Sequence, residues 1–142
     1  MTANERRVMQ ECSEAAHTGS LSFPEIVHRL AVQGVERYHA DYAREEITYY
    51  LATGESLVVP NPQHDAAAAP KAPIADTFSS EGVATAVRQS QRNEHNYLEF
   101  FRKTRQAGCV GYFVQITGRR ALYFGRRGET HVELFPGAPP PE

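Results

Sequence analysis

The amino-acid sequence predicts an α+β protein: a two-layer sandwich built from an internal duplication of a helix–helix–three-strand unit whose strands form an antiparallel meander. The first observation behind this prediction is that the chain matches itself without gaps at a spacing of 74 residues, from 23–58 onto 97–132. The second is that both segments change from a helical hydrophobic period to alternation by two at equivalent positions. The sequence leaves open whether the six expected strands share one sheet.

Seven of the 36 aligned positions are identical, and the glycines and tyrosines among them recur in register. The identical pairs are Glu25/Glu99, Gly34/Gly108, Tyr38/Tyr112, Tyr49/Tyr123, Gly54/Gly128, Glu55/Glu129 and Val58/Val132. Residues that are the same in both copies are expected to serve the fold, whereas chemistry is expected where the copies differ. The paired tyrosines are therefore assigned to the core.

Two helices are expected in each copy. The first covers about residues 4–17 in copy one and 80–91 in copy two. The second begins after Ser22 in copy one, because a serine followed by proline and glutamate is typical of a helix start. Gly34 and Gly108 then stand where a left-handed residue ends a helix at low cost.

Three short strands follow each of these glycines. In copy two the alternation predicts strands at 109–117, 121–125 and 129–135, separated by turns that contain glycine and arginine. In copy one the equivalent alternation is expected to point Tyr38 and Ala40 into the core.

The chain is expected to be one domain of two repeats. Repeat one covers residues 4–59 and repeat two covers 79–135. A Pro/Ala-rich linker at 60–78 joins them, because closely spaced prolines cannot continue a helix or a central strand. Residues 136–142 are expected to form a disordered tail.

Composition excludes several classes of protein. The 142 residues carry a net charge of −2 and are 41% hydrophobic, which excludes a wholly disordered chain. No run approaches the roughly 20 apolar residues of a membrane-spanning helix, and no apolar stretch follows Arg6 and Arg7 as in a secretory signal. Two cysteines, Cys12 and Cys109, suit a reducing compartment. A cytoplasmic protein with no membrane partner is expected.

Several short motifs, spread over about residues 5–136, resemble those of a known family. They are Phe23-Pro24-Glu25, Gly34-Val35, Tyr38, Asp41-Tyr42, Thr48-Tyr49-Tyr50, Gly54-Glu55-Ser56, Ala107-Gly108-Cys109-Val110-Gly111-Tyr112 and Gly128-Glu129-Thr130-His131-Val132-Glu133. As a set they resemble the YdfO-like family, a bacterial and prophage-associated domain of unknown function sometimes labelled "phage envelope protein". The resemblance implies a small two-layer α+β domain and implies no particular catalytic or binding residue.

Two His-x-acid pairs stand where the copies differ. His39 and Asp41 lie on one expected strand, and His131 and Glu133 on another, so each pair projects from one face of its strand. Imidazole with carboxylate is a candidate divalent-metal set, or a general base with its orienting acid. The alternative is that both pairs are ordinary polar residues on solvated strand faces, and no metal or other cofactor is predicted.

Cys109 and His131 are the candidates for thiol catalysis. A cysteine nucleophile needs a base, and His131 is the histidine on a strand of the same copy. The alternative is a buried small side chain, because Val35 fills the equivalent position in copy one. The chain has no Gly-rich phosphate loop, no Gly-x-Ser-x-Gly and no Cys-x-x-Cys motif.

Charge is unevenly divided between the copies. Residues 1–70 carry a net charge of −5 and residues 71–142 a net charge of +3. Three interpretations are open: the copies complement each other within one chain or between chains as a homo-oligomer, the arginines form solvated turns, or they bind nucleic acid. The pI near 6.3 and the absence of a nucleic-acid-binding motif make nucleic acid the least favoured.

The sequence favours a non-enzymatic ligand- or protein-binding module, because a junction between two repeats is a usual place for a binding surface. The partner is an unknown small molecule or protein. The alternative is a metal- or thiol-dependent enzyme that uses the His-x-acid pairs or Cys109. The candidate binding residues are His39, Asp41, Phe113, Gln115, His131, Glu133, Arg119 and Arg120.

Overall fold

Two units with the same element order make up the protein. The computed structural model describes residues 1–61 and 73–136. Unit one contains α1 (Ala3–Thr18), α2 (Phe23–Val32), β1 (Val35–Asp41), β2 (Glu46–Leu51) and β3 (Ser56–Pro60). Unit two contains α3 (Ser80–Gln91), α4 (Tyr97–Gln106), β4 (Cys109–Gln115), β5 (Arg120–Gly125) and β6 (Thr130–Leu134). The α+β class and the twice-repeated helix–helix–strand order are confirmed.

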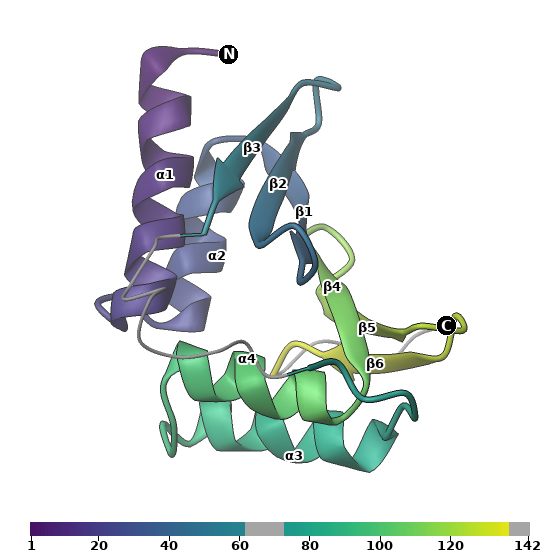
Figure 1. Cartoon of the computed structure of the whole chain (residues 1–142). Helices are drawn as coiled ribbons and strands as arrows, with labels where there is room; N and C mark the ends of the chain where they lie inside the picture. Colours follow the sequence, from purple (N-terminus) through teal and green to yellow (C-terminus); the bar gives the residue numbers. More distant parts are fainter. Residues whose placement is uncertain (62–72, 137–142) are drawn as a thin grey trace.

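All six strands form one antiparallel sheet, in the order β3-β2-β1-β4-β5-β6 (Figure 1). The second helix and the three strands of each unit have equivalents whose bounds lie 74 residues away at both ends. The first helices differ, with 16 residues in α1 and 12 in α3. The structure thus answers the question that the sequence left open: the two units share a sheet.

An approximate two-fold axis passes between the two central strands, β1 and β4. His39 lies opposite Phe113, and these two residues are equivalent at the spacing of 74. On either side of them, Arg37 lies opposite Gln115 and Asp41 opposite Gly111. The register is therefore symmetric about the His39/Phe113 pair.

The helices begin and end where the sequence predicts. Ser22 caps α2 and forms a capping box with Glu25, and Ser79 caps α3 by accepting from the backbone N–H of Gly82. After the second helix of each unit, Gly34 and Gly108 adopt φ values of 83° and 86°. A side chain disfavours this left-handed region, so glycine ends these helices at low cost.

The helices cover one face of the sheet, and one hydrophobic core lies between the two layers. Figure 1 shows α1 and α2 beside the strands of unit one and α3 and α4 beside those of unit two. The four paired tyrosines are at most 6% exposed, which confirms their assignment to the core: they are Tyr38, Tyr49, Tyr112 and Tyr123. Side chains of both units belong to the same cluster, so neither unit has a core of its own.

Side chains also join the two units outside the sheet. The hydroxyls of Tyr42 and Thr104 are 2.7 Å apart in a buried hydrogen bond. The guanidinium of buried Arg105 lies 4.6 Å from the ring centroid of Phe101 and 5.9 Å from that of Tyr42. These contacts tie α4 to the end of β1.

The described ends of the predicted linker at 60–78 lie against the two units that it joins. Pro60 is the last residue of β3, and residues 73–79 form a strap on unit two. The backbone N–H of Ala75 donates to the carbonyl of Arg105 (3.0 Å), and that of Ser79 donates to the carbonyl of Ala107 (2.7 Å). The carbonyls at the end of α4 need such donors, which is why the chain stays on the surface of unit two. Residues 62–72 of the linker and 137–142 of the predicted tail lie outside the described residues.

Two further expectations concern the membrane and the thiols. Over residues 1–61 and 73–136, no helix combines the length and the apolar character needed to cross a bilayer. Cys12 and Cys109 are both free and buried, 1% and 0% exposed.

Candidate functional site

The face of the sheet away from the helices, here called the open face, has a row of mainly apolar side chains across its middle. The central row consists, in register order, of Val58, Thr48, His39, Phe113, Leu122 and Val132. The rings of His39 and Phe113 stack at its centre, with centroids 4.5 Å apart and planes 12° apart. The two valines on the edge strands are 49% and 46% exposed. The row is therefore an apolar stripe one side chain wide and six strands long.

Opposite charges flank the central row. Asp41 and Glu46 lie opposite each other on one side of it, here called the acidic flank. Arg37 and Arg120 lie on the other side, the basic flank, each opposite Gln115. The Arg37 guanidinium lies 4.3 Å from the centroid of the Tyr50 ring. The open face is thus apolar along its middle, with carboxylates on one side, where Glu46 pairs with Arg44, and guanidinium groups on the other, where Arg37 pairs with Glu36.

His39 and Asp41 have different roles on this face. Burial lowers the pKa of His39 below its usual value, although the charges of Asp41 and Glu46 partly oppose that effect. His39 is therefore neutral at pH 7 and packs as an aromatic ring. The Asp41 carboxylate accepts from the backbone N–H groups of Ala43 (3.0 Å) and Arg44 (3.1 Å), so it holds the turn after β1.

His131 and Glu133 lie on the opposite face of the sheet from His39 and Asp41. His131 is opposite Tyr123 and Glu133 is opposite Ala121, and both of those partners are buried under the helices. The four candidate residues are therefore not gathered into one metal site. Within the described ranges, no three His, Cys, Asp or Glu side chains are grouped so as to hold a metal ion. Alternation shows that each pair shares a face, but it cannot show which face that is.

Of the predicted binding residues, His39, Asp41, Phe113 and Gln115 share the open face with Arg120. The inclusion of His131 and Glu133 in one surface with them is wrong for the reason just given.

Cys109 is not an accessible nucleophile. Its side chain is 0% exposed, and its thiol donates to the carbonyl of Gly111 at 3.1 Å. Burial raises the pKa of the thiol, so the reactive thiolate is disfavoured. The buried-side-chain interpretation fits, since Val35 is 3% exposed at the equivalent position.

A chain of three polar side chains joins α3 to β6. The Oγ of Ser80, an exposed residue at the start of α3, lies 2.5 Å from Nδ1 of His131. Nε2 of the same imidazole lies 2.6 Å from Oε1 of Glu133. The sequence offers His131 with Glu133 as a candidate base and orienting acid, but nothing in the local sequence points to Ser80, which is 51 residues away.

The arginines at the turns of unit two have structural partners. Arg126 donates to the carbonyl of Ile74 (2.8 Å), and Arg127 donates to that of Asp76 (3.0 Å), so both hold the strap. Arg119 occupies a left-handed turn position, with φ of 56°.

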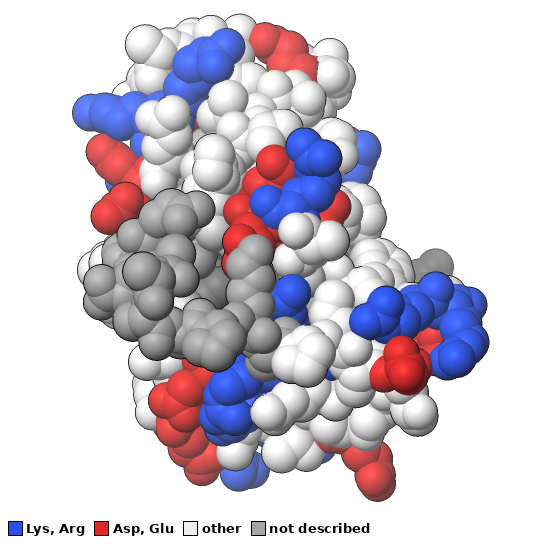
Figure 2. Space-filling view, in the orientation of Figure 1, with Lys and Arg blue, Asp and Glu red and all other residues white. Residues whose placement is uncertain are grey.

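On the face drawn in Figure 2, acidic and basic side chains are mixed and do not separate into an acidic and a basic half. Figure 2 shows both signs on the upper and the lower part of one face. In the described part of the chain, the ion pairs join residues of the same unit, such as Arg29 with Glu11 and Arg126 with Asp76. The interpretation that the two copies complement each other within one chain therefore gains no support from these ion pairs.

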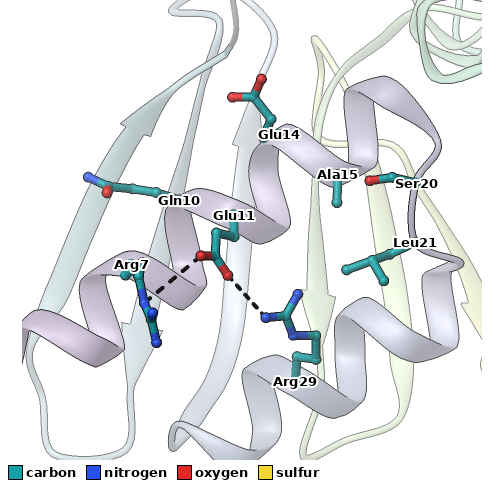
Figure 3. Close-up of a pocket in the computed structure, with 8 residues that line it drawn as sticks. All are labelled: Arg7, Gln10, Glu11, Glu14, Ala15, Ser20, Leu21 and Arg29. Carbon is teal, nitrogen blue, oxygen red and sulfur yellow. Dashed lines mark hydrogen bonds and ion pairs between the residues drawn. The ribbon is translucent and has the colours of Figure 1, made fainter.

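Two open grooves lie between neighbouring helices. The larger, about 560 Å³, lies between α1 and α2 (Figure 3). There Glu11 stands between two guanidinium groups, 3.9 Å from Arg7 and 3.0 Å from Arg29. In the smaller groove, about 430 Å³ between α3 and α4, the Lys103 ammonium contacts Gln89 and His95. Glu11 thus pairs with two arginines in the first groove, whereas Lys103 contacts an amide and an imidazole in the second.

No protein-family model matches the chain, and a search of curated proteins finds no match. Its function must therefore be argued from the geometry of its own residues.

Proposed function

We propose that this protein is a binding module whose binding surface is the open face of the sheet. The observation that carries the proposal is the central row, in which Val58 and Val132 are about half exposed on either side of the His39/Phe113 stack. A continuous exposed apolar stripe with a polar rim is typical of an interaction surface. The two grooves between the helices are lined mainly by polar side chains and lack such a stripe.

The partner that best fits this face is a second copy of the chain. In a symmetric dimer with its two-fold axis along the central row, the acidic flank of one copy lies over the basic flank of the other. Asp41 then faces the Arg37 of the second copy, because both residues lie on β1 on either side of His39. A self-complementary face of this kind gives a closed dimer, and complementary flanks set its orientation.

The setting of this module is part of the same proposal. The resemblance to the YdfO-like family supports a bacterial, prophage-associated protein, and the two free buried cysteines support a cytoplasmic location.

A small aromatic ligand on the His39/Phe113 stack is the competing occupant of the open face. It would leave the chain monomeric, so the two occupants are distinguishable by mass.

The test is sedimentation equilibrium of the full chain between about 1 µM and 1 mM, at low and high salt. We expect a monomer–dimer equilibrium that weakens as salt screens the flanks. Val132→Glu places a carboxylate in the central row and should raise the dissociation constant at least about tenfold. Val32→Glu is the matched control, because Val32 is 68% exposed on α2, away from the open face. A chain that stays monomeric at 1 mM, or equal association of Val132→Glu and wild type, would contradict the second-copy partner.

A further inference from the structure

The hydrogen bonds along Ser80, His131 and Glu133 have a defined direction. Glu133 as a carboxylate can only accept, so Nε2 of His131 carries the proton and donates to Oε1 across 2.6 Å. Nδ1 is then unprotonated and accepts from the Ser80 hydroxyl across 2.5 Å. A nucleophile next to a base, with the base oriented by a carboxylate, is the arrangement that activates a serine.

Unit one shows that the fold does not need this polar chain. Residues 74 positions before His131 and Glu133 are Leu57 and Val59, which belong to or pack against the hydrophobic core. Helix α1 packs against β3 in unit one much as α3 packs against β6 in unit two. Apolar side chains therefore suffice to hold a first helix to an edge strand. Polar groups at the same place carry a desolvation cost that the fold alone does not require.

A second serine–histidine pair on the same helix has the opposite electrostatics. At the end of α3, the Ser90 Oγ lies 2.7 Å from Nε2 of His95, whose Nδ1 lies 3.0 Å from the Lys103 ammonium. Burial and the Lys103 charge lower the pKa of His95, so this imidazole is a poor proton acceptor. A carboxylate stands behind His131 where a cation stands behind His95. The Ser90–His95 pair is therefore an internal control for the effect of the Glu133 carboxylate on the Ser80–His131 pair.

Backbone donors lie beside the Ser80 hydroxyl. Ser80 and Glu81 are the first two residues of α3, and the first turn of a helix leaves amide groups without intrahelical acceptors. The amides of Gly82 and Val83 are taken by the side chain and the carbonyl of Ser79. Those of Ser80 and Glu81 have no acceptor within the helix, and the helix dipole there favours the negative charge that develops on the carbonyl oxygen of the substrate.

From these observations we infer that Ser80, His131 and Glu133 form a catalytic site that transfers acyl groups from esters, with Ser80 as the nucleophile. The site lies on the helix-covered side of the sheet edge and is separate from the open face. Because Ser80 is exposed at the surface, the acyl group is small or is presented at the surface of a larger substrate.

The reaction has two steps. The Ser80 oxygen attacks the ester carbonyl carbon while its proton passes to Nδ1 of His131. The tetrahedral oxyanion collapses, the bond to the leaving alcohol oxygen breaks, and His131 returns the proton to that oxygen. Water then attacks the acyl-Ser80 ester with His131 again as the base, which releases the carboxylic acid and restores the serine. Glu133 is a positioning residue that keeps the imidazole in the required tautomer.

The first experiment uses a fluorophosphonate probe on the full chain, with mass spectrometry to locate the adduct. The serine oxygen displaces fluoride from phosphorus, so an adduct reports an activated serine. We expect one adduct, on Ser80, and none in Ser80→Ala. His131→Gln should slow its formation about 100-fold or more, which is the usual contribution of a positioned base. Ser90→Ala, the matched control, should label like wild type.

The second experiment separates catalysis from folding. Release of nitrophenol from p-nitrophenyl acetate is measured against pH for wild type, Glu133→Gln and Glu133→Asp, with thermal melting of each variant. We expect Glu133→Gln to lower the rate and move the pH profile, and Glu133→Asp to restore part of the rate. Absence of a Ser80 adduct in wild type, equal labelling of Ser90, or an unchanged pH profile in a folded Glu133→Gln would overturn the site.

Discussion

The two units have the same order of helices and strands, but they differ in the side chains that lie between the first helix and the edge strand. In unit one, the first helix contacts the edge strand, whose Leu57 and Val59 pack against or belong to the hydrophobic core. In unit two, a polar chain from Ser80 to Glu133 occupies that place. Unit two also carries the strap, which is bonded to the end of α4. Positions shared by the units maintain the fold, and the positions at which they differ carry the polar chemistry.

The strap also changes what the shared glycines can tolerate. Gly34 and Gly108 have the same left-handed backbone, yet their surroundings differ. A Cβ at Gly34 would meet nothing within 4 Å, whereas a Cβ at Gly108 would lie 2.4 Å from the carbonyl oxygen of Thr77. Both positions thus favour glycine because of their positive φ, but only at Gly108 would a side chain also collide with the backbone.

The largest expected effect on the free energy of unfolding comes from replacing Gly34 or Gly108 with alanine. Gly34→Ala should lower the free energy of unfolding by about 1–2 kcal/mol, the cost of a left-handed side chain. Gly108→Ala should cost about 2 kcal/mol more, because the strap backbone must also move. Urea denaturation of both variants measures the difference.

The control pair for this comparison is Gly54→Ala and Gly128→Ala. Both glycines have positive φ, and neither has an atom within 4 Å of a built Cβ. The two variants should therefore lose equal stability. Equal losses for Gly34→Ala and Gly108→Ala would show that the strap does not lie against unit two.

A smaller effect is expected when unit two receives the residues of unit one at the polar chain. The double variant His131→Leu, Glu133→Val should unfold within about 1 kcal/mol of wild type, because well-packed apolar residues replace a paired polar group at little cost. Differential scanning calorimetry measures the stability, and the fluorophosphonate adduct on Ser80 should disappear. A loss of more than about 2 kcal/mol would mean that the polar chain holds the fold and that its comparison with Leu57 and Val59 fails.

The smallest effect on stability is expected from His39→Phe. This variant has phenylalanine at both of the equivalent positions that face each other across the two-fold axis, 39 and 113. The folded state lowers the pKa of His39, so the unfolded state binds the proton more readily. This contribution to stability is intact above the ordinary histidine pKa of about 6.5 and is lost as pH falls below it. Wild type should therefore lose stability relative to His39→Phe between pH 7 and pH 5 in parallel urea titrations. Parallel curves at all pH values would show that His39 stays accessible in the folded protein.

Much of the fold follows from local chemistry. Ser22 and Ser79 cap their helices, and the glycines end α2 and α4, because these effects act within a few residues. The candidate site was only half predictable. His131 and Glu133 are two residues apart on one strand, so alternation pairs them, but Ser80 reaches them only through the packing of α3 on β6. The sequence left open whether Cys109 is a nucleophile or a buried side chain for a related reason, since periodicity cannot measure how deeply a strand start is buried.

The sequence by itself determined the elements, their order and the repeat at 74 residues, because capping, turn geometry and hydrophobic alternation are short-range effects. Only the tertiary structure decided that β1 pairs with β4 into one sheet, that His39 and His131 face opposite sides, and that the strap lies on unit two. These features depend on which faces and edges meet when both units bury their apolar surfaces together. That outcome is a property of the assembled core, and no single stretch of the chain encodes it.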